Sequence, residues 1–392
     1  MRCLSAIALG LTLTIGAVAQ EEGFVSLFDG ESLEGWEIHG GQATYDVEDG
    51  TIVGRVKPNT PGNTFLCTKK HYGDFILKLD LKLDSPMNSG IQLRSHIREE
   101  NDRVFGYQCE VDPSARAWSG GIYDEARRGW LYSLSGDDEA KKRARAAFKP
   151  EDWNEYKIEA VGPTIKTWIN GIPCADLVDF ADLEGLIALQ VHAGKSPGVI
   201  RWKNIRIKDL GKSEWKPLFD GKDLSQWEKL GGGEWTVEDG TIRGTSKAES
   251  AVHGILCSKR EYGDFAIRLK YKPVQGNSGL YFRTEKSGDN VVVHGFQAEI
   301  DPRNDPGSLY ETGGRGWVSR VPLEVSQEVF KPGDWNEMSV VAQGRDITVF
   351  VNGTEVTRLR DDPGRTKGYL GLQLHGGEDM EVYFKDIEIM EF

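Results

Sequence analysis

Residues Phe105–Pro113 read FGYQCEVDP, and the closely related HGFQAEIDP stands at His294–Pro302. From Tyr107 and Phe296 onward, apolar and polar residues alternate, which is typical of a β-strand with one face in a core. In each copy two carboxylates stand two positions apart and therefore share a strand face. The pattern predicts two related β-domains, each with an acidic strand face.

The two stretches belong to a repeat that covers almost the whole chain. LFDGESLEGW returns as LFDGKDLSQW, NSGIQLRS as NSGLYFRT, RRGW as GRGW, and FKPEDWNEY as FKPGDWNEM, always in the same order. A repeat of this length is a duplicated domain, because solenoid repeats are far shorter. We expect a first domain over residues 22–209 and a second over residues 214–392.

Strand and turn signals dominate each copy. Phe75–Leu83, FILKLDLKL, alternates strictly, and pairs such as Asn170-Gly171 and Asp239-Gly240 mark tight hairpins. Asp137–Phe148 is the exception and predicts a short surface helix. Many short antiparallel strands in a domain of this size predict an all-β fold of two tandem jelly-roll β-sandwiches.

The first residues form a separate segment. Arg2 precedes an apolar run that ends at Ala17-Val18-Ala19, a pattern that predicts a signal peptide over residues 1–19 rather than a buried N-terminal helix. We therefore expect a secreted or periplasmic protein. No later apolar run is long enough to span a membrane.

Charge and cysteine content narrow the function classes. The 392-residue chain has a net charge of −13, which argues against nucleic acid as a partner because phosphates need a basic surface. Cys67 and Cys257 occupy the same repeat position without a repeated partner. We therefore expect the cysteines after the signal peptide, Cys109 and Cys174 included, to be buried free thiols.

Alternation places polar side chains on one face of three strands in each copy. Gln108, Glu110 and Asp112 share a face on the first strand, because Tyr107, Cys109 and Val111 point the other way. A solvated sheet face is the alternative, but neighbouring strands would join these side chains into one groove. The remaining members are Gln92, Arg94, Gln190 and His192 in the first copy and Tyr281, Arg283, Gln297, Glu299, Asp301, Gln373 and His375 in the second.

These residue types suit acid–base chemistry on a glycoside. Carboxylates at i and i+2 lie roughly 7 Å apart on a strand, and their repulsion raises one pKa, which separates an acid from a base. Arginine can hold a carboxylate ionised or bind an oxyanion, and histidine can move a proton near neutral pH. Binding of a divalent cation is the alternative use of these groups; otherwise no cofactor is expected.

Aromatic residues follow the carboxylates in both copies. Tyr123 and Trp130 in the first copy correspond to Tyr310 and Trp317 in the second, and the tyrosines stand in glycine-rich surroundings. Aromatic faces stack on the C–H faces of sugar rings, although core packing would also account for such residues. We expect a carbohydrate ligand.

The motifs LFDGxxLxGW, VEDGxIxG, YGDF, NSGI, QxEIDP, RGW and WNEY resemble those of the 3-keto-disaccharide hydrolase domain, over the whole mature chain and twice. The resemblance implies a concanavalin-A-like jelly roll, export from glycan-degrading bacteria, and a glycoside substrate oxidised to a ketone at C3. It also implies elimination at C1 and C2 followed by addition of water, a net hydrolysis.

Roles follow from this implied chemistry. Glu110 or Asp112 is expected to act as base, His192 as acid or proton shuttle, and Arg94 as donor to the enolate; Glu299, Asp301, His375 and Arg283 are their counterparts. The first copy is expected to be the active one, because it keeps more titratable groups. The alternative is a non-catalytic carbohydrate-binding protein. The expected substrate contacts are Gln92, Gln108, Tyr123, Trp130, Gln190, Tyr281, Gln297, Tyr310, Trp317 and Gln373.

Overall fold

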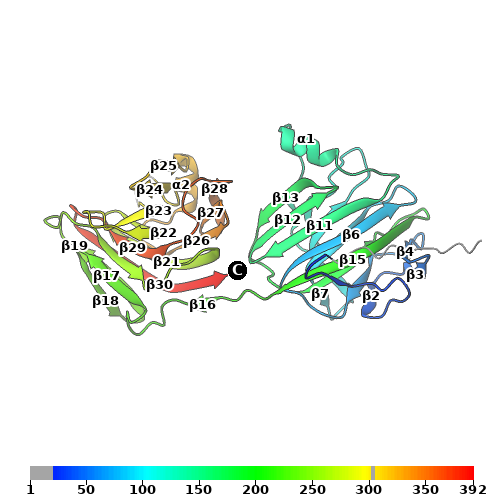
Figure 1. Cartoon of the computed structure of the whole chain (residues 1–392), viewed down its shortest axis with the longest axis horizontal. Helices are drawn as coiled ribbons and strands as arrows, with labels where there is room; N and C mark the ends of the chain where they lie inside the picture. Colours follow the sequence, from blue (N-terminus) through cyan, green and yellow to red (C-terminus); the bar gives the residue numbers. More distant parts are fainter. Residues whose placement is uncertain (1–20, 302–304) are drawn as a thin grey trace, which may run out of the picture.

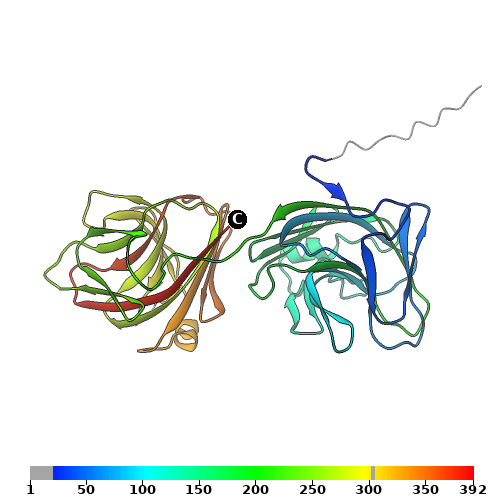
Figure 2. The same ribbon diagram turned by 90° about the horizontal axis from the view of Figure 1, so that it is seen from below.

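The computed structural model describes residues 21–301 and 305–392. Over these residues the chain forms two lobes that lie side by side, and each lobe is a pair of antiparallel sheets (Figure 1). Seen from below, the two sheets of each lobe face one another across its core (Figure 2). The predicted all-β fold of two tandem jelly-roll sandwiches is confirmed. The predicted signal peptide lies outside the described residues.

The first domain holds an eight-stranded and a seven-stranded sheet. Their orders are β13-β12-β11-β6-β15-β4-β3, with β1 paired to β15, and β10-β9-β8-β7-β14-β5-β2. The strands are β1 (Val25–Ser26), β2 (Trp36–Gly40), β3 (Thr44–Glu48), β4 (Thr51–Arg55), β5 (Thr64–Thr68), β6 (Asp74–Leu83), β7 (Ser89–Arg98), β8 (Arg103–Val111), β9 (Ile122–Glu125), β10 (Gly129–Tyr132), β11 (Asn154–Val161), β12 (Thr164–Ile169), β13 (Ile172–Val178), β14 (Leu186–Val191) and β15 (Val199–Gly211).

The second domain repeats this topology. Its sheets have the orders β18-β19-β30-β21-β26-β27-β28, with β16 paired to β30, and β17-β20-β29-β22-β23-β24-β25. The strands are β16 (Lys216–Pro217), β17 (Trp227–Gly231), β18 (Glu234–Glu238), β19 (Thr241–Ser246), β20 (Gly254–Ser258), β21 (Phe265–Gln275), β22 (Ser278–Lys286), β23 (Val293–Ile300), β24 (Leu309–Thr312), β25 (Gly316–Ser319), β26 (Asn336–Gln343), β27 (Asp346–Val351), β28 (Thr354–Leu359), β29 (Tyr369–Leu374) and β30 (Met380–Glu391).

Two short helices interrupt the strands at equivalent places. The helix predicted over Asp137–Phe148 forms as α1 (Glu139–Arg145), and its N-terminus is capped by the Asp138 side chain, which accepts from the Lys141 amide. The helix α2 (Leu323–Val329) precedes β26 in the same way and was not expected from the sequence. Neither is long and apolar enough to cross a membrane, which holds for every helix of the described residues.

Local sequence explains the hairpins and the cores. Asn170 and Gly171 have φ values of 50° and 77°, so both adopt the left-handed conformation that a tight two-residue hairpin needs. The side chains expected to point inward do so: Tyr107, Cys109 and Val111 lie in the first core, and their second-domain counterparts lie in the second core. The expectation of buried free cysteines is confirmed for the four described ones.

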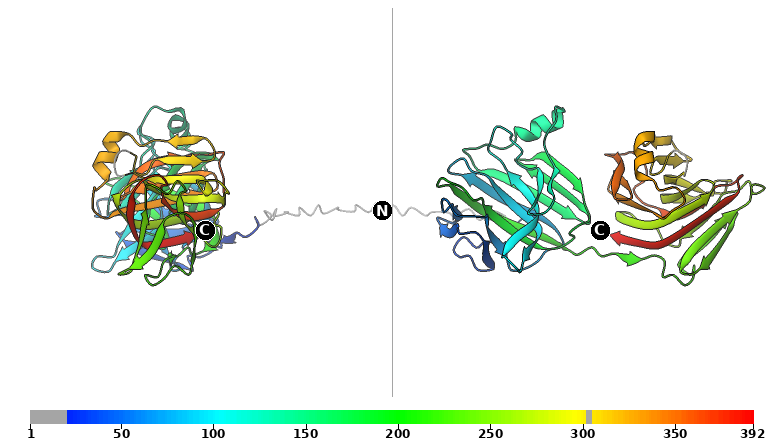
Figure 3. Two further views of the ribbon diagram at one scale, coloured as in Figure 1. Left: turned by 90° about the vertical axis from the view of Figure 1, so that its left-hand side faces the viewer. Right: turned by 180° about the vertical axis from the view of Figure 1, so that it is seen from behind.

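The two domains also touch one another. An apolar cluster joins Val178 of the first domain to Ala266, Val341 and Met390 of the second. The Lys166 ammonium lies 2.8 Å from the Asp346 carboxylate across the same joint. The C-terminus lies between the lobes (Figure 3). Each domain nevertheless has a core of its own, so each positions its own groove.

Candidate functional site

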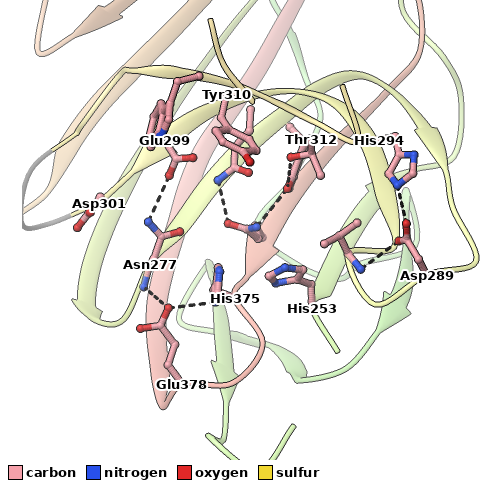
Figure 4. A pocket seen from close by; sticks show the side chains of 16 residues that line it. His253, Asn277, Asp289, His294, Glu299, Asp301, Tyr310, Thr312, His375 and Glu378 are labelled. Atoms are coloured by element: carbon pink, nitrogen blue, oxygen red, sulfur yellow. Dashed lines mark hydrogen bonds and ion pairs between the residues drawn. The ribbon is translucent and has the colours of Figure 1, made fainter. Parts of the chain in front are cut away.

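Each seven-stranded sheet carries a polar pocket on the face turned away from its core. The second-domain pocket has a volume of about 620 Å³ (Figure 4). It is lined by His253, Asn277, Tyr281, Asp289, Val291, His294, Gln297, Glu299, Asp301, Tyr310, Thr312, Gly313, Trp317, Gln373, His375 and Glu378. The first-domain pocket has a volume of about 250 Å³. It is lined by Asn88, Gln108, Glu110, Arg116, Tyr123, Glu125, Trp130 and His192.

The repeated Asn-Ser-Gly motif at the start of β7 builds the floor of the first-domain pocket. The Asn88 amide donates to the Glu110 carboxylate at 2.6 Å. Gly90 leaves room for Gln108, because a Cβ there would lie 2.2 Å from the Gln108 side chain. The Gln108 amide then donates to Glu110 at 2.9 Å. The motif therefore has a local physical role that its repetition alone did not reveal.

Glu299 is the most strongly perturbed carboxyl of the second-domain pocket. Burial raises the pKa of Glu299 to about 8, with further increases from Asp301 and Asp305. The Asn277 amide, which donates to Glu299 at 3.2 Å, opposes this increase. Glu299 is therefore protonated at neutral pH and can donate a proton to a bound ligand.

His375 sits at the end of β29 and is oriented by two oxygen acceptors. Its Nδ1 lies 2.8 Å from the Gly376 carbonyl oxygen and 3.2 Å from the Glu378 carboxylate (Figure 4). Because a carbonyl oxygen can only accept, the neutral ring carries its proton on Nδ1. The Nε2 lone pair is then available as a base, and Glu378 stabilises the imidazolium that forms.

His253 precedes β20 and is held in the opposite tautomer. The Gly376 backbone N–H donates to His253 Nδ1 at 2.8 Å, so the ring proton of neutral His253 is on Nε2. Burial and the neighbouring His375, whose ring centroid is 4.4 Å away, lower the pKa of His253 to about 4. His253 therefore stays a neutral N–H donor at physiological pH.

A chain of polar side chains connects the rest of the second-domain pocket. Gln297 donates to the Gln373 oxygen at 3.0 Å, and Gln373 donates to the Tyr281 hydroxyl at 3.2 Å. Tyr281 lies 3.0 Å from the Thr312 hydroxyl. Each amide is therefore oriented by its neighbour on this side of the pocket.

Aromatic rings cover one side of each pocket, as expected for a sugar site. Tyr310 and Trp317 meet edge to face with centroids 5.2 Å apart, and Tyr123 and Trp130 do so at 5.3 Å. Trp317 is 43% exposed, which leaves its ring available to a ligand. These four predicted substrate contacts all line a pocket.

The prediction that Arg94 and Arg283 face the grooves is wrong. Arg94 is fully buried on the other side of β7, where its guanidinium donates to the carbonyl oxygens of Gly73 and Gly162 and to the Asp74 carboxylate. Arg283 makes the corresponding contacts in the second domain. Both arginines join the two sheets of a sandwich, and neither can contact a ligand in a pocket.

A bulge explains this error. The alternation that groups Gln92 with Arg94 holds only while both residues keep extended backbones, but Arg94 has a φ of 46° and Arg283 a φ of 49°. The pairing of β7 with β8 shifts register between Leu93 and His96. The bulge turns Arg94 to the core side of the strand.

Three further predicted residues of the first domain lie beside or below its pocket rather than in its lining. Gln92 and Gln190 are fully buried and donate to Gln108 at 2.8 Å and 2.9 Å. Asp112 binds the Arg116 guanidinium at 2.8 Å and the Ser114 amide at 3.1 Å, contacts that outweigh burial and lower its pKa. Asp112 therefore holds a loop. Gln108, Glu110 and His192 do line the pocket, as do all the second-domain predictions except Arg283.

The second-domain pocket also contains residues that the sequence did not reveal. His253, His294 and Glu378 have no equivalent in the first copy, where Asn63, Phe105 and Lys195 stand at the corresponding positions. The prediction of pocket residues relied on identity between the two copies, so it missed residues that are present in only one copy. His294 Nε2 lies 2.6 Å from the Asp289 carboxylate at the pocket wall. The other missed lining residues are Asn277, Asp289, Val291, Thr312 and Gly313 in the second domain and Asn88, Arg116 and Glu125 in the first.

The alternative use of these groups, a divalent-cation site, has no matching cluster. Over residues 21–301 and 305–392, no group of three or more His, Cys, Asp or Glu side chains is arranged to hold a metal ion.

A protein-family model described as the 3-keto-alpha-glucoside-1,2-lyase-like domain matches residues 23–208 and again residues 214–390. None of the curated proteins compared with the chain matches it.

Several solved structures are similar to a part of the chain. A candidate glycosyl hydrolase of Parabacteroides distasonis is 26% identical with a TM-score of 0.34, covering 46% of this chain and 100% of its own. A carbohydrate-binding module from Bacillus subtilis is 17% identical with a TM-score of 0.33, covering 42% and 95%. A β-glucanase from Bacillus licheniformis is 16% identical with a TM-score of 0.35, covering 47% and 100%.

Proposed function

The chain belongs to the 3-keto-alpha-glucoside-1,2-lyase-like domain family, and from that premise we propose that its second domain cleaves 3-keto-α-glucosides by elimination. The observation that carries this proposal is one pocket holding a protonated carboxyl, Glu299, and two imidazoles, His253 and His375, whose Nδ1 atoms face a backbone N–H and a carbonyl oxygen of Gly376 respectively. These three groups supply the acid, the electrophile and the base that such an elimination needs.

The substrate itself prepares the reaction. A ketone at C3 makes the proton on C2 acidic, because the electron pair left on C2 delocalises into the C3 carbonyl. His375 Nε2 takes that proton, and the C3 oxygen becomes an enolate oxygen. The imidazolium is stabilised by Glu378, which lies 3.2 Å from Nδ1.

Two donors complete the cleavage. His253 Nε2–H donates a hydrogen bond to the enolate oxygen, and its low pKa keeps the ring neutral, so that it acts as a neutral N–H donor. As the enolate collapses, a C1–C2 double bond forms and the bond from C1 to the glycosidic oxygen breaks. Glu299 protonates the departing oxygen. Addition of water across the double bond then restores a 3-keto sugar, so that the overall change is hydrolysis.

Placing the reaction in the second domain revises the expectation from the sequence. The first copy has more titratable residues along its strands, but the larger pocket and the paired imidazoles belong to the second. His253 takes over the role that the sequence gave to the arginines. The base is a histidine rather than Glu110 or Asp112, and the acid is a glutamate.

Incubation of the full-length protein with 3-keto-trehalose tests the proposal. We expect release of glucose and an ultraviolet-absorbing enone, together with exchange of the C2 proton for solvent deuterium. Unoxidised trehalose serves as the control and should not be cleaved. Binding of 3-keto-trehalose without any product or exchange would contradict the elimination and favour a purely carbohydrate-binding protein.

We also propose that the protein is exported, since Arg2 and Ala17-Val18-Ala19 frame an apolar run at its N-terminus. Expression in a Gram-negative host followed by N-terminal sequencing of the periplasmic fraction tests this. We expect the mature chain to start at Gln20. An unprocessed cytoplasmic chain would contradict it.

A further inference from the structure

We propose that the first-domain pocket binds an unoxidised α-glucoside and does not cleave it, a second site that complements the elimination proposed for the second domain and rests on that function for its choice of sugar. The two pockets share a floor of asparagine, glutamine and glutamate in the same register. They differ at the positions that would contact C3 of the sugar ring.

The first difference is Asn63, which stands where the second domain has His253. Asn63 Oδ1 accepts from the Ala193 amide at 2.9 Å, just as His253 Nδ1 accepts from the Gly376 amide at 2.8 Å. Asn63 Nδ2 therefore corresponds to the Nε2–H donor of His253. In the first domain one of the two Nδ2 hydrogens donates to Glu125 Oε1 at 3.4 Å, which brings a carboxylate to this part of the pocket.

Glu125 gives the corner of the first-domain pocket beside Asn63 the opposite hydrogen-bonding character to the corner beside His253. It lines the first-domain pocket at the position of Thr312, is 6% exposed, and also pairs with Arg103 at 3.4 Å. A carboxylate accepts hydrogen bonds and repels a carbonyl oxygen or an enolate. The corner therefore suits a C3 hydroxyl, whereas the second-domain corner, with its N–H donor, suits a C3 ketone.

The proton-transfer groups of the first domain are also changed. His192 Nδ1 contacts the Ala193 carbonyl oxygen at 2.7 Å, but Lys195 stands where the second domain has Glu378. Burial raises the pKa of Glu110, while Asn88 and Gln108 donate to it and Arg116 lies 3.9 Å away. Two amide donors thus hold Glu110 in the pocket lining, where a sugar hydroxyl can form a hydrogen bond with its carboxyl group.

The aromatic side of the first-domain pocket is built as a rigid platform. Trp130 packs against Trp118 at 4.8 Å and against Tyr123 at 5.3 Å, and the Arg116 guanidinium lies over both tryptophans, 5.0 Å from the Trp130 ring. A fixed aromatic face reduces the entropy lost on stacking a sugar. The volume of about 250 Å³ suits a ligand of roughly one pyranose ring, smaller than most drug-sized ligands.

Calorimetric titration of the full-length protein tests this site. In a His375→Ala background, which prevents turnover, trehalose and 3-keto-trehalose are titrated separately. We expect Trp130→Ala to weaken trehalose binding about tenfold and to leave 3-keto-trehalose binding unchanged. The matched Trp317→Ala should give the reverse, and Trp130→Phe, which keeps an aromatic face, should restore most of the trehalose affinity.

Glu125→Thr tests the specificity directly, because threonine is the second-domain residue. We expect it to shift the preference of the first-domain pocket toward 3-keto-trehalose by about tenfold. Loss of trehalose binding through Trp317→Ala, or no trehalose binding in any form of the protein, would overturn the proposal. Unchanged thermal unfolding of each variant establishes that a lost site is not a lost fold.

The two proposals fail in different ways. Turnover of 3-keto-trehalose without trehalose binding would refute the first-domain site alone. Trehalose binding that depends on Trp130, without turnover of any 3-keto sugar, would refute the elimination and leave the first-domain site standing.

Discussion

The two domains have the same strand order but opposite hydrogen-bond direction in their pocket floors. In the first domain the amide of Gln108 donates to Glu110 at 2.9 Å. In the second, the Gln297 amide donates to Gln373 at 3.0 Å, and its contact with Glu299 has a smaller effect on that carboxyl than the Asn277 contact. Glu299 is left with Asn277 at 3.2 Å as its main donor. Burial raises the pKa of both carboxyls, but two close amide donors oppose this increase at Glu110 and mainly one opposes it at Glu299.

The cause of this reversal is one residue on the neighbouring strand. Gln92, in the first domain, donates to Gln108 and turns the Gln108 nitrogen toward Glu110. Tyr281, its counterpart, offers a hydroxyl that accepts from Gln373, which turns the Gln373 oxygen toward Gln297. Duplicated folds can therefore acquire different chemistry through one side chain that orients the amides around a carboxyl.

The largest expected difference between the domains concerns their histidines. His375→Ala removes the proposed base and should lower kcat for 3-keto-trehalose by about 10²–10⁴-fold. His192→Ala, the matched change, should lower it by less than about threefold. Steady-state kinetics at pH 7 measure both, and an equal loss in the two variants would break the assignment of activity to the second domain.

Replacing either buried arginine should change the free energy of unfolding rather than the activity, and the change should differ between the two domains. Arg94→Ala removes the guanidinium from the buried Asp74 carboxylate and from the carbonyl oxygens of Gly73 and Gly162, so we expect a loss of about 3–5 kcal/mol in the first domain. Arg283→Ala should cost less, because the Asp264 side chain is 39% exposed and water can replace the guanidinium. Urea unfolding followed domain by domain measures both. Larger destabilisation by Arg283→Ala would contradict the comparison.

Glu299 should set the alkaline limit of the reaction. Because its pKa is raised to about 8, the protonated acid is present below that pH, and kcat should fall about tenfold per pH unit above it. Glu299→Gln should lower kcat by roughly 10–100-fold and abolish this fall in kcat at alkaline pH, the alkaline limb of the pH profile. Glu110→Gln should leave the limb in place. A limb that persists in Glu299→Gln would assign it to another group.

The same raised pKa predicts that stability also falls as the pH rises. The folded protein binds more protons at Glu299 than the unfolded chain between its ordinary pKa and about 8, so stability falls as the pH rises through this window. Glu299→Gln, which cannot ionise, should be more stable than the wild type at pH 9 by on the order of 2 kcal/mol. At pH 4 the difference should vanish. Thermal unfolding at the two pH values checks this.

The smallest expected effect tests the cause of the reversed amides. Tyr281→Gln gives the second domain the first-domain residue, so Gln297 should turn toward Glu299 and lower its pKa. The alkaline limb should then move to lower pH by less than about one unit, with a few-fold loss of kcat at pH 7. Tyr281→Phe, which lacks the hydroxyl but offers no new amide, is the control. If the alkaline limb of the kcat profile stays at the same pH in Tyr281→Gln, the direction of the amides does not set the pKa of Glu299.

Sequence alone determined the duplication, the strands and the inward side chains, because these depend on local alternation and on repeated turn residues. It therefore also placed Gln108, Glu110, Glu299 and His375 on pocket-facing positions. It failed for Arg94, because a bulge breaks the alternation and bulges leave no periodic signal.

Only the tertiary structure decided which side chains share a pocket. His253 and His375 come from segments far apart in the chain, and their tautomers follow from the backbone N–H and the carbonyl oxygen of one residue, Gly376. The acidity of Glu299 likewise depends on burial and on amides of neighbouring strands. Proton affinities are set by three-dimensional surroundings, so a linear pattern of residue types names the groups but not their roles.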